Sequence, residues 1–181
     1  DGPNPHHGEI LPDSSRGPGL NGMPTPDVIT ASSFVFGATP LNVDQNAQTS
    51  ALEWCGGQWA WDLWSGGATA SSSTAGILAL IYQAYYQANG EFPDFSTAKA
   101  LLRSGADNMN YDILAQGAGY TNAEKSTNIA ANLDGLFLNQ TSWTPGDYRG
   151  VEYEEFTNIM HPGTSANKTF LIENRNQTDS S

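Results

Sequence analysis

The distribution of apolar residues predicts one long helix in the middle of the chain, over residues 69–89. Apolar side chains there occupy nearly every face of a helix with 3.6 residues per turn. A helix that is apolar almost all round is typical of one buried at the centre of a domain. Asn89 and Gly90 then form a usual helix stop. The apolar positions are Ala75, Ile77, Leu78, Ala79, Leu80, Ile81, Ala84 and Tyr85.

Two shorter helices are predicted after this one. The first covers residues 96–104, with Ser96 as its cap and with Ala98, Leu101 and Leu102 on its inner face. The second covers residues 122–133. A tight turn at Gln116-Gly-Ala-Gly119 separates them, because closely spaced glycines favour turns.

Two segments have the composition of strands. Residues 27–36 (DVITASSFVF) and 168–173 (KTFLIE) are rich in β-branched and aromatic side chains, which favours extended structure. Residues 1–30 are rich in Pro and Gly and are predicted to be loop. After Gly135 the character changes to aromatics, Pro and Gly, which indicates a boundary between two domains.

The charge balance excludes some classes of partner. The net charge is −12 and only seven residues are Lys or Arg, so neither nucleic acid nor an anionic membrane surface is an expected partner. No apolar run is long enough for a membrane span. Asn139, Asn167 and Asn176 each open an Asn-x-Thr triplet for glycosylation. With a single cysteine, Cys55, they favour an extracellular or cell-surface protein.

Three stretches in order resemble the subtilisin-like serine proteases. DSSRGPGLNGMPTPDVIT (residues 13–30) is similar to the family segment S-S-R-G-P, a short turn, then P-D-V. SGGATASSSTAG (residues 65–76) is similar to the nucleophile motif S-G-T-S-x-A-x-P-x-x-A-G. YDILAQGAGYTNAEKS (residues 111–126) is similar to the closing segment Q-G-x-G-x-[VI]-[ND]-A-x-x-A.

The resemblance implies a three-layer α/β fold with a mostly parallel sheet and a buried central helix, of which this chain holds a part. Residues 1–133 would be the C-terminal portion of the peptidase domain. Residues 134–181 would be a linker and the beginning of a β-rich domain.

Laying the nucleophile motif on the chain without gaps places Ala68 where the family has its attacking serine. Ser65, Gly66, Ala70, Ala75 and Gly76 match the motif, Gly67 stands where the family has Thr, and Ser72 replaces Pro. A register with Thr69 as the nucleophile breaks the Ser-Gly and Ala-Gly matches. Gly66, Gly67 and Trp64 are the candidate substrate-binding residues, and the amide of Ala68 is a candidate oxyanion donor.

The resemblance also implies a polypeptide substrate and a missing half. In this family the catalytic Asp and His and the oxyanion Asn precede the S-S-R-G-P segment, and only thirteen residues precede Ser14 here. The N-terminal half of the peptidase domain is therefore an expected partner. Without a hydroxyl at position 68 no acyl-enzyme forms, so the chain is expected to be inactive as it stands.

Two other readings of the chain are open. In an active endopeptidase, Ala68 would be a deliberate knockout of the attacking serine. A natural pseudoprotease could instead keep the fold as a cell-surface binding or structural module, and Gly67 and Ser72 favour this slightly because a designed knockout changes one residue. An unrelated surface protein with a chance match is the third reading.

Three clusters are expected to be structural rather than catalytic. The tryptophans of residues 54–64 could line a substrate cleft, but packing of a loop is the preferred reading. Asp44, Glu53 and Asp62 could bind calcium as in relatives, but no Asp-x-Asp loop supports a metal site, so neither metal nor cofactor is predicted. His6, His7 and His161 are interpreted as loop residues.

Overall fold

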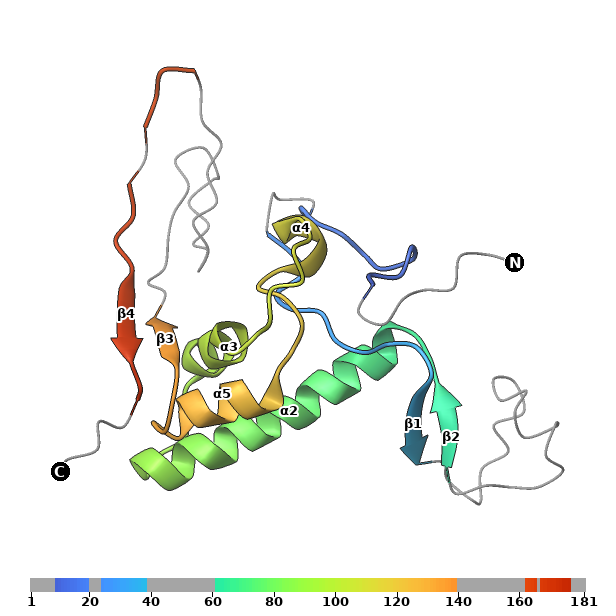
Figure 1. Cartoon of the computed structure of the whole chain (residues 1–181), viewed down its shortest axis with the longest axis horizontal. Coiled ribbons are helices and arrows are strands. Elements are labelled where there is room, and N and C mark those ends of the chain that lie inside the picture. Colours follow the sequence, from blue (N-terminus) through green and yellow to red (C-terminus); the bar gives the residue numbers. More distant parts are fainter. Residues whose placement is uncertain (1–8, 20–23, 39–60, 140–161, 166, 177–181) are drawn as a thin grey trace, which may run out of the picture. The chain divides into compact units, whose positions relative to one another are not determined.

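The computed structural model describes residues 9–19, 24–38, 61–139, 162–165 and 167–176 (Figure 1). The chain divides into two compact units. The hairpin unit is Thr30–Ala75, and the helical unit comprises Asp1–Ile29 and Gly76–Ser181. Each unit is considered by itself below.

Helix α2 (Gly67–Asn89) confirms the long helix predicted from the apolar pattern. It begins two residues before the predicted start, directly after Gly66, whose φ of 110° is one that other residues rarely adopt. It ends where the sequence predicts. The amide of Gly90, with φ of 76°, donates to the carbonyl of Tyr86 at 2.9 Å and closes the last turn.

Helix α3 (Phe95–Ser104) buries the inner face predicted for it, Ala98, Leu101 and Leu102. The predicted cap is wrong by two residues. Asp94 is the cap, because its carboxylate accepts a hydrogen bond from the amide of Thr97 at 2.7 Å.

Two short helices follow, α4 (Ile113–Gln116) and α5 (Ala123–Ala130). Asn122 caps α5 by accepting a hydrogen bond from the amide of Lys125 at 3.0 Å. The predicted extension of this helix to residue 133 is wrong. The chain leaves helical geometry at Asn132, which has a positive φ of 57°.

The core of the helical unit joins α2, α3, α5 and strand β3 (Leu136–Asn139), as Figure 1 shows. Phe137 of β3 is 2% exposed and packs in the same cluster as the helical residues. The proposed domain boundary between residues 133 and 134 stays a prediction. The buried members of the cluster are Ile81, Leu101, Leu102, Ile129, Ala130 and Phe137.

The strands form two antiparallel pairs. In the hairpin unit, β1 (Val35–Ala38) pairs with β2 (Trp61–Trp64). In the helical unit, β3 pairs with β4 (Leu171–Asn174). Within the described residues, the one parallel pairing is the isolated bridge between Ile29 and Tyr120. The architecture is mixed α/β, and the mostly parallel sheet is absent from the described part of the chain.

Both predicted strands are shorter than expected. Of residues 27–36, only the last two belong to a strand, because the earlier part instead runs beside residues 118–121. Of residues 168–173, the strand β4 takes the last three and continues to Asn174.

The expectation of a centrally buried helix is not met in the described structure. Ile81 is the buried residue of α2, whereas Leu80 is 49% exposed and Tyr86 is 48% exposed. The described core residues pack against one side of the helix, through Ile77, Leu78, Ile81, Ala84 and Tyr85. An apolar pattern shows which faces can be buried, but burial also requires an element to cover each face.

Candidate functional site

Ala68 lies in a strand–turn–helix segment of the hairpin unit. Strand β2 ends at Trp64, Ser65 and Gly66 form the turn, and α2 begins at Gly67. Ala68 is therefore the second residue of the helix, and it is exposed. A side chain placed there stands at the positive end of the helix dipole, on the first turn, whose amides have no acceptor within the helix.

The turn is held by hydrogen bonds from the segment before β1. The amide of Gly66 donates to the carbonyl of Ser32 at 2.6 Å. The hydroxyl of Ser65 accepts a hydrogen bond from the amide of Phe34 at 3.1 Å. The side-chain role of Ser65 was missed from the sequence, because its partner lies 31 residues away. These bonds fix the point at which the helix starts, and so fix the position of residue 68.

Gly67 and Ser72, the two departures from the family motif, are both compatible with this geometry. A Cβ atom on Gly67 would meet no atom within 4 Å, so nothing described prevents a larger residue there. The hydroxyl of Ser72 donates to the carbonyl of Ala68 at 3.0 Å. Ser72 can also keep the backbone amide that a proline would lack, so the early helix remains regular.

Thr69, the alternative nucleophile, is less accessible than Ala68. Thr69 is half-buried and its amide donates back to the carbonyl of Gly66 at 3.1 Å. An attacking group must reach solvent and substrate, so accessibility favours position 68.

Trp64, a candidate substrate-binding residue, is half-buried on the hairpin. A Cβ atom on Gly37 would lie 2.7 Å from Cδ1 of Trp64, so the indole ring covers Gly37. This contact gives Trp64 a packing role in the hairpin. Substrate binding by Trp64, Gly66 and Gly67 stays a prediction.

The other two family-like segments lie side by side within the helical unit. The amide of Gly17 donates to the carbonyl of Leu114 at 2.8 Å, and the amide of Ala118 donates to the carbonyl of Asp27 at 2.9 Å. The backbone of Ile29 bonds to both Gly119 and Thr121. Segments about 90 residues apart in the sequence therefore form one backbone interface.

Glycines permit this close approach. Gly117 has φ of 62°, and a Cβ atom there would lie 2.2 Å from the carbonyl oxygen of Pro26. Gly119 has φ of 130°, and its Cβ would lie 2.1 Å from the carbonyl oxygen of Asp107. A side chain at either position would collide with backbone, which explains the Gly-x-Gly spacing of the turn.

The buried side chain of Gln116 orders the loop before α4. Its Oε1 accepts from the amide of Met109 at 2.9 Å. Its Nε2 donates to Oδ1 of Asn108 at 2.8 Å and to the carbonyl of Tyr111 at 2.7 Å. The residue that opens the Gln-Gly-x-Gly turn therefore has a structural function in this unit.

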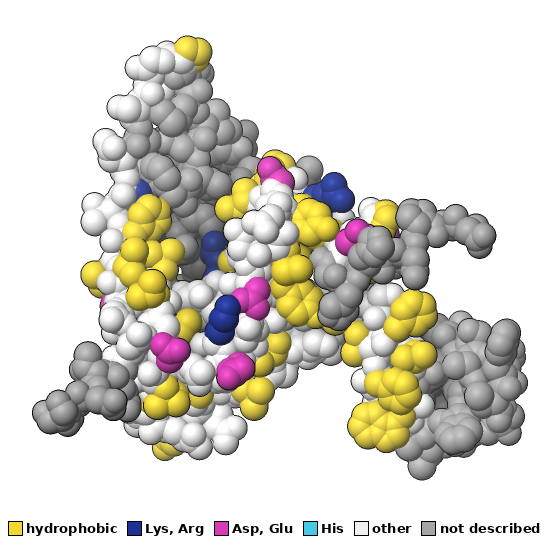
Figure 2. All heavy atoms as spheres, viewed as in Figure 1, with side chains coloured by type: hydrophobic (Ala, Val, Ile, Leu, Met, Phe, Trp, Pro, Cys, Tyr) yellow, Lys and Arg dark blue, Asp and Glu magenta, His cyan; other side chains and the backbone are white. Residues whose placement is uncertain are grey.

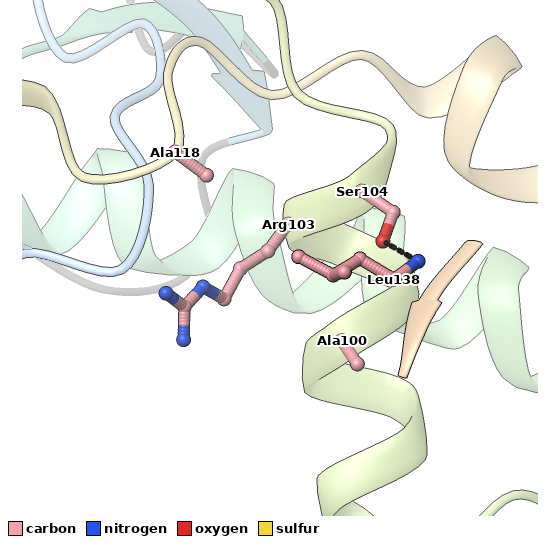
Figure 3. Close-up of a pocket in the computed structure, with 5 residues that line it drawn as sticks. All are labelled: Ala100, Arg103, Ser104, Ala118 and Leu138. Atoms are coloured by element: carbon pink, nitrogen blue, oxygen red, sulfur yellow. Dashed lines mark hydrogen bonds between the residues drawn. The ribbon is translucent and has the colours of Figure 1, made fainter. Parts of the chain in front are cut away.

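A cavity of about 100 Å³ in the helical unit offers no catalytic arrangement (Figure 3). The hydroxyl of Ser104 accepts a hydrogen bond from the amide of Leu138 at 3.2 Å. Arg103 and Lys99 both pair with Asp27, at 3.8 and 3.0 Å. The lining residues are Ala100, Arg103, Ser104, Ala118 and Leu138.

Several sequence candidates lie outside the described residues. These include Asp44, Glu53 and the side chain of Asp62, the three possible calcium ligands in the sequence. Among the described residues, no group of three or more His, Cys, Asp and Glu side chains could hold a metal ion. The other positions outside the description are His6, His7, His161, Trp54 and Trp59.

The three glycosylation candidates differ in setting. Asn167 is exposed. Asn176 is also exposed, and its Oδ1 accepts a hydrogen bond from the amide of Gly135 at 2.7 Å. Asn139 ends β3, and its side chain lies outside the described part of the structure. Attachment of glycans at these positions stays a prediction.

Comparison with known proteins finds little that is similar. No family model matches the chain, and no curated protein matches it. A solved structure described as the crystal structure of a lanthipeptide protease is similar at 19% identity and a TM-score of 0.46. The similarity covers 53% of this chain and 28% of that chain.

None of the helices in the described residues has the length and apolarity to cross a membrane.

Proposed function

We propose that this chain is the part of an extracellular subtilisin-like serine endopeptidase that contains the position of the nucleophile. Ala68 stands there in the place of the attacking serine. The observation that carries the proposal is the exposure of residue 68 on the first turn of α2, directly after a glycine turn. This local geometry supports the position that the sequence motif assigns to the nucleophile.

The chemistry follows from what the position offers. A serine hydroxyl here would attack the carbonyl carbon of a peptide bond, and a histidine would accept its proton. The amide of residue 68 and the helix dipole would stabilise the negative charge on the oxyanion. Ala68 keeps the amide but has no oxygen to attack, so this chain forms no acyl-enzyme.

The proposal requires a second part that carries the catalytic Asp and His and the oxyanion Asn. That part would complete a three-layer fold with a parallel sheet and cover the exposed side of α2. The exposed Leu80 and Tyr86 support this requirement, because large apolar side chains concentrated on an exposed surface are typical of one that another element covers.

The test co-produces this chain with the proposed second part, which carries the catalytic Asp and His and the oxyanion Asn. In the Ala68→Ser variant we expect a fluorophosphonate probe to label the chain covalently, with mass spectrometry locating the adduct at position 68. The unchanged chain should take up no label. The matched control is Ala68→Ser combined with Thr69→Val, which should still label.

Two results would contradict the endopeptidase proposal. One is labelling at Thr69, which would overturn the register of the motif. The other is no labelling of the Ala68→Ser variant although the two halves form a stable complex.

A natural pseudoprotease is the second candidate, and Gly67 and Ser72 favour it. Both depart from the family motif, yet both fit the helix as it stands. A single engineered substitution at position 68 would have left the other two positions unchanged. An alanine codon at position 68 in the natural gene supports this candidate, and a serine codon excludes it.

A further inference from the structure

One face of the β1–β2 hairpin is apolar and exposed. The register pairs Phe36 with Leu63 and Ala38 with Trp61, so these four side chains share a face. Phe36 is 68% exposed, Trp61 is 59% exposed and Leu63 is 45% exposed. Figure 2 shows hydrophobic side chains gathered over this hairpin. We call this set, Phe36, Ala38, Trp61 and Leu63, the hairpin face.

The opposite side of the hairpin is different. Val35, Gly37 and Trp64 are half-buried, and the indole of Trp64 covers Gly37. The register pairs Gly37 with Asp62, so this side of the hairpin is not uniformly apolar, whereas the hairpin face is. Large apolar residues concentrated on a solvent-exposed surface are typical of a binding surface.

The charge of the unit limits what this surface can bind. The sequence of Thr30–Ala75 contains the acids Asp44, Glu53 and Asp62 and no Lys, Arg or His. The net charge of the whole chain is −12. Such a field attracts cationic partners and repels acidic ones. Aromatic rings such as those of Phe36 and Trp61 also accept cations on their faces.

The shape of the surface favours an extended partner. Side chains on one face of a strand repeat every second residue, a spacing that an extended peptide shares. Strand β2 also runs into the Ser65–Gly66 turn, so a peptide on this hairpin lies in the same unit as position 68.

We propose that the hairpin face binds an extended segment of the polypeptide substrate in which apolar residues alternate with Lys or Arg. This inference rests on the proposed function, because it names a substrate of the proposed endopeptidase, but its test does not involve chemistry at position 68. It assigns a substrate class to the site: polypeptides that are both apolar and basic.

The experiment measures binding of three labelled ten-residue peptides to the full chain by fluorescence anisotropy. The first alternates Leu with Arg, the second alternates Leu with Glu, and the third alternates Ser with Arg. We expect the first to bind at least about tenfold more tightly than either of the others, because it alone has both properties. Its affinity should fall as salt is added.

Matched variants locate the binding. Phe36→Thr combined with Trp61→Thr should weaken binding of the Leu/Arg peptide by about tenfold or more, since both large side chains leave the surface. Threonine is tolerated in strands, which preserves the hairpin. The control is Ile172→Thr on β4, a residue that is 64% exposed in the other unit, and it should change the affinity by less than about twofold. Circular dichroism checks that all variants keep the fold.

Three results would overturn the inference. Equal binding of the Leu/Glu peptide would show that the hairpin face binds apolar peptides without selecting for positive charge. Equal weakening by Ile172→Thr would show that the peptide binds elsewhere. Self-association of the chain that the double variant abolishes, measured by sedimentation, would make a second copy the occupant. The endopeptidase proposal fails separately, if the fluorophosphonate test fails while selective peptide binding persists.

Discussion

The two units of this chain differ in how far their apolar side chains are buried. The helical unit buries a cluster that includes Leu101 at 0% exposure and Phe137 at 2% exposure. In the hairpin unit no described side chain is buried, and Phe36 and Trp61 face solvent. The helical unit therefore has its own source of stability, whereas the hairpin unit has an exposed surface and the candidate catalytic position.

The difference has a physical basis in the covering elements. Helix α3 is covered on its inner face by α5 and β3, so its apolar residues leave water. The β1–β2 hairpin is a two-stranded sheet, and a two-stranded sheet without a packed face is only marginally stable. We therefore expect the functional surface on the hairpin unit, because hydrogen bonds hold its backbone in place while no described element covers its apolar face.

The largest expected effect is a difference in the free energy of unfolding between variants of two leucines, one in each unit. Leu101→Ala should lower the free energy of unfolding by about 4 kcal/mol, because it removes a fully buried side chain and leaves a cavity. Leu63→Ala should lower it by about 1 kcal/mol or less, because Leu63 is exposed. Denaturant titration followed by circular dichroism measures both. Equal losses would show that the hairpin is as well packed as the helical core.

A smaller effect separates two glycines. Gly117→Ala should cost about 2–3 kcal/mol, since it combines a positive φ with a Cβ that collides with the carbonyl of Pro26. Gly67→Ala should be neutral or stabilise the protein by up to about 1 kcal/mol, because its site is open and helical. Thermal melts of both variants give the comparison. Destabilisation by Gly67→Ala would mean that an additional element lies against the start of α2.

The smallest effect concerns the cap of α3. Asp94→Ala should cost about 1 kcal/mol, because it removes the acceptor for the amide of Thr97. The hydrogen bonds from Thr97, chiefly from its backbone amide, lower the pKa of Asp94. The stabilisation from this lowered pKa is complete above the ordinary aspartate value of 3.8 and is lost as the pH falls through the lower folded-state value.

The control for the cap is Asp94→Asn, which keeps a cap but does not titrate. Its stability should therefore change less than that of the wild type when the pH is lowered below 3.8. An identical acid dependence of the two proteins would assign the loss of stability to other carboxylates, such as Asp107, whose pKa is lowered chiefly by its hydrogen bond from Lys125.

Local features were predictable from the sequence, and long-range ones were not. The end of α2 at Asn89 and the buried face of α3 follow from residue spacing and turn chemistry, and both are confirmed. The predicted caps and strand limits were less accurate. The sequence pattern favours Ser96 as the cap of α3, whereas the structure has Asp94, since both residue types cap helices and only the backbone geometry decides between them.

The candidate site also combines local features, which the sequence predicts, with long-range ones, which it does not. Its motif places residue 68 directly before the helix predicted from residue 69, and in the structure α2 begins at Gly67, after Ser65 and Gly66. The hydrogen bond between Ser65 and Phe34 and the interface of residues 17–29 with residues 114–121 join positions far apart in the chain. No local pattern encodes such pairs.

By itself, the sequence determined that helices form in the segments of α2, α3 and α5, where α2 stops, and that the residue at position 68 carries no reactive oxygen, whereas it did not predict α4. Those properties depend on backbone preference, side-chain spacing and residue identity, all of which are local. Only the tertiary structure decided that one side of α2 is covered and that one face of the hairpin is exposed. Burial depends on which distant segment packs against a surface, and an apolar residue looks the same in the sequence whether or not a neighbour covers it.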